Sequence, residues 1–177
     1  MGMAKAEVTI EGLTPLLMHR FPLEPVEAID KKPMAEQAEL AAYRTPSGEL
    51  YLPGTALQRA FIGGAAFSKG KGRASLQKVA AACLMVTPEY LGLGKDTTYT
   101  IDSRAVVIPS TKGRIVRHRP RLDKWQTTFS LEWDDTLLAG PQVRRIVDDT
   151  GQRVGLLDFR PERKGPFGRF VVTHWDS

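Results

Sequence analysis

Alternation of apolar and polar residues identifies the segments most easily assigned to strands. In Ala6–Met18, Val8 and Ile10 alternate with Thr9 and Glu11. Because successive side chains of a strand point to opposite faces, this pattern predicts a strand with one buried face.

Three later segments are also strand-like. Gln126–Trp133 alternates cleanly and predicts a half-buried strand, and Arg169–Trp175 predicts a last one. Thr97–Ile108 is rich in Thr, Tyr, Ile and Val, and the turn residues Pro109–Gly113 follow it. With the return through Arg114–Lys124, these residues predict a β-hairpin.

Helical spacing of apolar residues predicts three longer helices. The first starts at Pro53-Gly54-Thr55, with the threonine as N-cap. The second runs from a capping Ser75 through Val86. The third starts near Pro141, which suits a first helical turn, and Gly151 is a fitting C-terminal stop.

The order of strand, helix, strands, helix and strand predicts an α+β domain of ferredoxin-like or RNA-recognition-like fold. A length of 177 residues fits a single domain over 1–177. His19–Leu50 is rich in proline, with one helical stretch at Met34–Tyr43, and we interpret it as a surface insertion. A hairpin insertion is expected at about residues 107–124.

Composition narrows the class of protein. The chain is 42% hydrophobic and 25% charged, as in ordinary globular proteins. Its one cysteine, Cys83, lies in an apolar run and is interpreted as a buried structural thiol. No apolar run approaches the ~20 residues of a membrane span, and Met1–Glu11 is too charged for a signal peptide. We therefore expect a cytoplasmic protein with no membrane partner.

Charge is distributed very unevenly. Lys69–Lys78, Lys112–Lys124 and Gln152–Phe170 together contain 15 of the 25 basic residues and 3 of the 20 acidic ones. The rest of the chain has 10 basic and 17 acidic residues, a formal net charge of −7. Basic segments in an otherwise acidic chain indicate loops that meet a polyanion, and we expect them to converge into one groove.

Two of these segments carry further signals. Lys112–Trp125 adds an aromatic ring that could stack on an unpaired base or lie in the core. Gly155–Phe170 is bracketed by glycines, so its N–H groups could form an anion-binding nest. The alternative is a tight loop packed on its own domain.

Two motifs resemble the RAMP superfamily of CRISPR-associated proteins. Pro53-Gly54-Thr55-Ala56-Leu57 is similar to the family's early helix start, and Gly155 with Gly165-Pro166-Phe167-Gly168 is similar to its C-terminal glycine-rich loop. The resemblance implies a modified RNA-recognition fold and is closest to the backbone subunit of antiviral effector complexes. It further implies copies aligned head to tail along RNA, with other effector subunits as partners. A phage or mobile-element relative is the alternative.

We therefore predict non-catalytic binding of single-stranded RNA or DNA, RNA favoured, with weak sequence preference and steep salt dependence. The residues predicted to contact nucleic acid are His19, Arg20, Arg59, Lys69, Lys71, Arg73, Lys112, Arg114, Arg117, Arg119, Arg121, Lys124, Trp125, Arg160, Arg163, Lys164 and Arg169. Those predicted to form the glycine-rich loop are Gly155, Gly165 and Gly168.

Catalysis has little support in the sequence. One cysteine and three scattered histidines do not form a zinc site, and nucleotide-binding and nucleophile-elbow motifs are absent, so no cofactor is expected. His19 lies where some RAMP endoribonucleases carry a catalytic histidine, so such an enzyme is one alternative. The other is a phage or mobile-element assembly protein whose basic loops meet an acidic protein.

Overall fold

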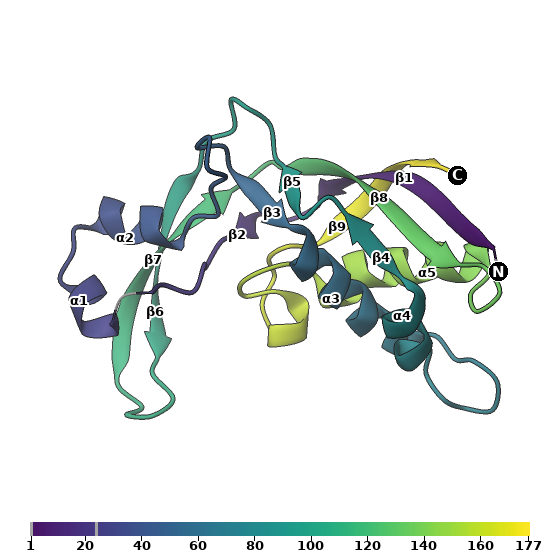
Figure 1. Ribbon diagram of the computed structural model, residues 1–177. Coiled ribbons are helices and arrows are strands. Elements are labelled where there is room, and N and C mark those ends of the chain that lie inside the picture. Colours follow the sequence, from purple (N-terminus) through teal and green to yellow (C-terminus); the bar gives the residue numbers. More distant parts are fainter. Residues whose placement is uncertain (1, 24) are drawn as a thin grey trace.

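The computed structural model describes residues 2–23 and 25–177, and its core is a four-stranded antiparallel sheet in the order β4-β8-β1-β9 (Figure 1). β1 lies between β8 and β9. The sheet and its two main helices comprise β1 (Met3–Gly12), α3 (Gly54–Gly64), β4 (Met85–Thr87), β8 (Gln126–Asp134), α5 (Gly140–Asp149) and β9 (Phe170–Asp176). This βαββαβ order confirms the predicted ferredoxin-like α+β fold.

One face of the sheet packs against α3 and α5. Val8 and Ile10 of β1 are completely buried, and the ring of Phe61 on α3 lies 5.8 Å from that of Phe129 on β8. Burying a large apolar side chain contributes about 1.5–3 kcal/mol. The alternation seen in the sequence therefore selects the face on which the helices pack.

Two insertions into this plan fold together as an arm beside the sheet, on the left of Figure 1. The arm consists of β2 (Leu16–Leu17), α1 (Val26–Asp30), α2 (Met34–Ala41), β6 (Thr100–Val107) and β7 (Arg114–Leu122). β7 pairs with β2 and β6, and α2 packs on β7. The short pair β3 (Tyr51–Pro53) and β5 (Tyr90–Gly92) links the arm to the sheet.

A buried arginine fixes the arm to the glycine-rich loop, Gly155–Gly168. The guanidinium of Arg119 on β7 pairs with Asp158 of the loop and lies 3.9 Å from Asp102 on β6. Its side chain is only 6% exposed. Burial strengthens the attraction between these charges, and the buried guanidinium depends on the two carboxylates for compensation.

Aromatic contacts extend this docking. The guanidinium groups of Arg104 and Arg121 lie 4.9 and 5.3 Å from the ring centre of Phe167 in the loop. Asp102 lies 2.8 Å from Arg104 and 3.5 Å from Arg121, so one carboxylate holds both arginines in place. Such cation–π contacts add about 0.5–2 kcal/mol each.

Three predicted boundaries are wrong, each for a local reason. The N-cap of α3 is Pro53, not Thr55, because Gly54 packs so closely on the backbone that a Cβ there would be 2.5 Å from the carbonyl oxygen of Pro88. The third helix passes Gly151 and continues as a π-helical segment, Thr150–Val154, before ending at Gly155. A Cβ at Gly151 would be 2.2 Å from the carbonyl oxygen of Phe170, so this glycine serves close packing.

The predicted second helix is also shorter than expected. α4 spans Gln77–Cys83, because the amide of Gln58 donates to the carbonyl of Leu84 and accepts from the N–H of Val86, holding these residues extended as they enter β4. Cys83 is buried and free, and burial raises the pKa of its thiol.

Short helical turns complete the fold at Ala65–Phe67 and Pro161–Arg163. Across residues 2–23 and 25–177, every helix is too short or too polar to cross a bilayer.

Replacing Arg119 tests the role of the buried arginine. Arg119→Met should lower the free energy of unfolding by roughly 1–3 kcal/mol, because it removes the arginine partner of the partly buried Asp158 and one of three arginines around Asp102. Arg114→Met, at an exposed position on the same strand, is the matched control and should change it by less than about 0.5 kcal/mol. Urea denaturation of both variants measures the difference, and equal stabilities would contradict the role.

Candidate nucleic-acid interface

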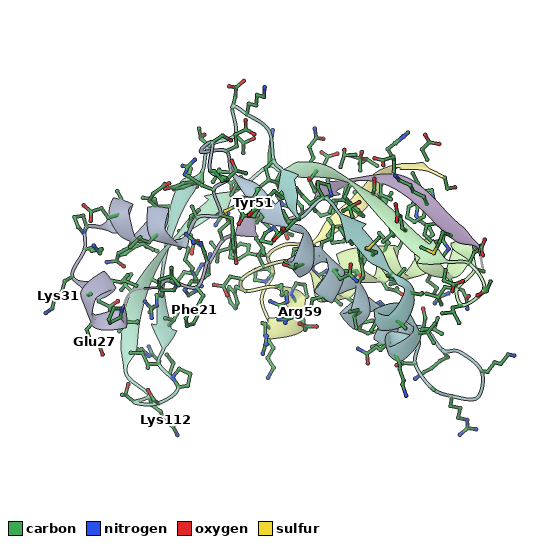
Figure 2. The ribbon with its side chains drawn as sticks, viewed as in Figure 1. Phe21, Glu27, Lys31, Tyr51, Arg59 and Lys112 are labelled. Atoms are coloured by element: carbon green, nitrogen blue, oxygen red, sulfur yellow. The ribbon has the colours of Figure 1, made fainter. Side chains whose placement is uncertain are left out.

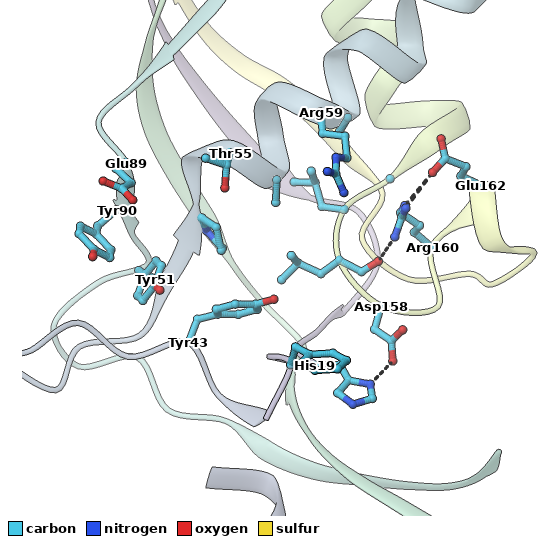
Figure 3. Close-up of a pocket in the computed structure, with 17 residues that line it drawn as sticks. His19, Tyr43, Tyr51, Thr55, Arg59, Glu89, Tyr90, Asp158, Arg160 and Glu162 are labelled. Atoms are coloured by element: carbon cyan, nitrogen blue, oxygen red, sulfur yellow. Dashed lines mark hydrogen bonds and ion pairs between the residues drawn. The ribbon is translucent and has the colours of Figure 1, made fainter. Parts of the chain in front are cut away.

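A cleft of about 630 Å³ lies between α3, the glycine-rich loop and the arm (Figure 3). Segments distant in sequence meet here. The chain enters the arm after β1, returns to begin α3, and forms the glycine-rich loop just before β9. The lining side chains named in Figure 3 are His19, Tyr43, Tyr51, Thr55, Arg59, Glu89, Tyr90, Asp158, Arg160 and Glu162.

Three tyrosines form one side of the cleft. The rings of Tyr43 and Tyr51 are 5.7 Å apart and those of Tyr51 and Tyr90 are 4.8 Å apart, both in edge-to-face arrangements. Burial raises the pKa of Tyr43 and of Tyr51, so both phenols stay neutral hydrogen-bonding groups at physiological pH. Tyr90 is 49% exposed.

Cationic groups occupy the other side. Arg59 extends from α3 toward the glycine-rich loop, where Arg160 pairs with Glu162 at 2.8 Å (Figure 3). The first turn of α3 also faces the cleft through Thr55 and Ala56, and N–H groups in a first turn have no intrahelical acceptor. This side can therefore attract an anion.

His19 pairs with an acidic residue at the base of the cleft. Its Nδ1 is 3.5 Å from Asp158, which also pairs with Arg119. Burial disfavours the Asp158 carboxylate, but the hydrogen bond with His19 and the charge of Arg119 outweigh it, so the pKa of Asp158 lies below its ordinary value. Within the described residues, no cluster of three or more His, Cys, Asp or Glu is placed to hold a metal ion.

The glycine N–H groups of the glycine-rich loop donate to backbone carbonyls of the protein, contrary to the predicted anion nest. Gly155 donates to Thr150, Gly165 to Arg160 and Gly168 to Pro15, at 2.8–2.9 Å. A Cβ at Gly165 would be 1.9 Å from the carbonyl oxygen of Phe159. These glycines therefore allow the loop to pack tightly on itself and on the segments beside it, which shapes the cleft wall.

Two predicted contact residues are buried, and the prediction is wrong for them. Trp125 is 4% exposed, and its indole N–H donates to the carbonyl of Thr14 at 2.9 Å, so neither ring face is open to a base. The guanidinium of Arg119 pairs with the carboxylates of Asp158 and Asp102, so it is not available to a phosphate. The sequence pattern could not predict the burial of either residue, because alternation does not distinguish a side chain that faces a ligand from one that faces another segment of the chain.

Other predicted cations divide into paired and unpaired groups. Arg117 lies 3.4 Å from Asp30, and Arg121 lies 2.8 Å from Asp123, so their charges are partly compensated. In the described part of the chain, no carboxylate lies within 4.0 Å of the remaining ones, namely Arg20, Arg59, Lys69, Lys71, Arg73, Lys112, Arg114, Lys124, Arg163, Lys164 and Arg169.

The three basic segments do not form one continuous groove. Lys112 points outward at the hairpin tip (Figure 2), and the loop of residues 69–73 lies at the opposite end of the molecule in Figure 1. Of the side chains predicted to contact nucleic acid, only His19, Arg59 and Arg160 line the cleft. The expected convergence is thus limited to the region between the arm and the glycine-rich loop.

The open face of the sheet lacks the features of a stacking platform. In its described strands this face carries no Phe, Tyr or Trp. It carries three glutamates instead: Glu7 accepts a hydrogen bond from the hydroxyl of Ser130, Glu132 lies 3.8 Å from Lys5, and Glu11 lies farther along β1. RNA-recognition domains stack bases on sheet aromatics, and this acidic surface would repel phosphates. The aromatic residues are instead in the cleft, where sequence reasoning did not place them.

Lowering the pH tests the charge network of the cleft. A carboxylate whose folded-state pKa is depressed stabilises the fold above its unfolded pKa, about 3.9, and this contribution is lost as pH falls through the folded-state value. The free energy of unfolding should therefore fall more steeply below about pH 5 in the native protein than in Asp158→Asn. Urea denaturation across this range measures the two slopes, and parallel slopes would contradict it.

Comparisons with known proteins give a likeness of fold. No family model and no curated protein matches the sequence. Among solved structures, a chain from the cryo-EM structure of the Type III-B Cmr-beta complex bound to cognate target RNA matches with a TM-score of 0.64 and 12% identity. The match covers 98% of this chain and 60% of that one, so this chain spans less than two thirds of its neighbour. At that identity the match establishes a common fold.

Proposed function

We propose that this protein binds single-stranded nucleic acid, RNA in preference to DNA, without cleaving it. The observation that carries the proposal is the cleft, in which a tyrosine side faces a side that includes the unpaired Arg59. Positive charge neutralises phosphates, and aromatic rings stack on unpaired bases. Both parts of a nucleotide thus find a matching surface.

The size of the cleft favours a single strand. About 630 Å³ is the volume of a small-molecule site, with room for a nucleotide unit but not for a duplex. Stacking also requires a base that is not already paired. The unpaired cations on residues 163–164 of the glycine-rich loop would then contact a phosphate next to the cleft.

The likeness of fold supports RNA as the strand bound. The neighbour belongs to a complex bound to cognate target RNA, and the early helix start and glycine-rich loop resemble RAMP motifs. In this proposal the protein is a repeated subunit of a ribonucleoprotein, with copies aligned head to tail along the strand beside other effector subunits. The hairpin tip, remote from its own cleft, would then be free to meet a neighbouring copy or its RNA.

Removing the unpaired arginine tests the binding mode. Arg59→Ala should weaken binding of a labelled single-stranded RNA and reduce the slope of log affinity against log salt by about 0.7, the value for one lost phosphate contact. Arg145→Ala, an exposed arginine on α5, is the matched control and should leave that slope unchanged. Fluorescence anisotropy between roughly 50 and 200 mM salt gives the slopes.

Three nucleic-acid probes and a nuclease treatment sharpen this test. Single-stranded RNA should bind more tightly than single-stranded DNA of the same sequence, and duplex RNA should bind least. Equal affinity for duplex and single strand, or no binding at low salt, would refute the proposal. A partner that remains bound to the purified protein after nuclease treatment would instead indicate a protein-binding module.

An RNA-cleaving enzyme is the second candidate, and one observation favours it. His19 faces the cleft, and the Asp158 carboxylate at 3.5 Å could orient its imidazole as a general base. If the protein is an endoribonuclease, His19→Ala should abolish RNA cleavage. For the non-catalytic protein, we expect no cleavage by either form and similar RNA affinities.

A further inference from the structure

We propose that the tyrosine side of the cleft is a stacking site for one unpaired base, with the attached phosphate directed toward Arg59. This inference rests on the proposed function and adds a prediction: part of the affinity comes from the base itself and not from the phosphate backbone. Binding would then distinguish a strand with bases from one without them, with little preference among the four bases.

The β3–β5 ribbon fixes two of the rings. Tyr51 pairs across the ribbon with Gly92, and Tyr90 pairs with Pro53, so all four lie on the same face. A Cβ at Gly92 would meet no atom within 4 Å, so nothing packs over the ribbon at that position. The backbone therefore holds both rings on one face of the ribbon, and both line the cleft.

Contacts among the tyrosines orient their rings. Tyr51 and Tyr90 are inclined at 82°, and Tyr43 and Tyr51 at 64°, so each ring supports the next at its edge. This edge-to-face chain leaves Tyr90 half exposed at the mouth of the cleft. A ring held in place loses little conformational entropy on binding, which makes it an effective stacking surface.

Charge along the cleft sets the direction of the nucleotide. Asp158 and Glu162 are compensated by Arg119 and Arg160. Among the described charges that line the cleft, this leaves Glu89 beside Tyr90 at one end and Arg59 at the other (Figure 3). The carboxylate repels phosphate from the tyrosine end while the guanidinium attracts it, so the neutral base meets the tyrosines.

The experiment uses two RNA probes of equal length, one ordinary and one lacking its bases. The native protein should bind the ordinary strand more tightly. Tyr90→Leu should reduce affinity for the ordinary strand by roughly 5- to 150-fold, the range for one stacked base, and leave the abasic strand almost unaffected. Tyr90→Phe, which keeps the ring, should retain affinity for both.

The same titrations include a control variant and define the results that would contradict the stacking site. Phe67→Leu removes an exposed ring that does not line the cleft and should alter neither affinity. Equal affinity of the native protein for both strands, or an equal loss for both in Tyr90→Leu, would overturn the stacking site while nucleic-acid binding stands. Failure of the native protein to bind either strand would overturn both proposals.

Discussion

The arrangement of the cleft depends on the buried charge group formed by Arg119, Asp102 and Asp158. Taking charged groups out of water is costly, so such a group persists only where each charge faces an opposite one. Here Arg119 reaches its nearest carboxylate, that of Asp158, only when β7 and the glycine-rich loop are together. One electrostatic constraint thus positions the arm against the rest of the domain and keeps the cleft between them.

The same group explains why a count of basic residues overestimates the binding surface. Arg119 and Arg121 face carboxylates of their own chain, whereas Arg59 does not. Sequence shows how many cations a segment carries, but the carboxylates that compensate them come from strands and loops far along the chain. Asp158, for example, follows Arg119 by 39 residues.

Sequence periodicity was most informative where many residues share one environment. The strands around Val8 and Phe129 were predictable because alternate positions face the helices along their length. The three-residue strand β5, which pairs with β3, was not, since so few residues give no pattern. The tyrosine side of the cleft depends on that short pair, so the most aromatic part of the candidate site could not be located before the fold was known.

The central place of β1 has a consequence for how the protein is made. Both of its neighbours, β8 and β9, lie more than a hundred residues downstream. While the ribosome is still translating, the first strand therefore emerges without either partner, and its apolar side chains must wait for residues 126–176. Such non-local pairing slows folding and leaves both edges of this strand unpaired in the nascent chain, where they are open to aggregation.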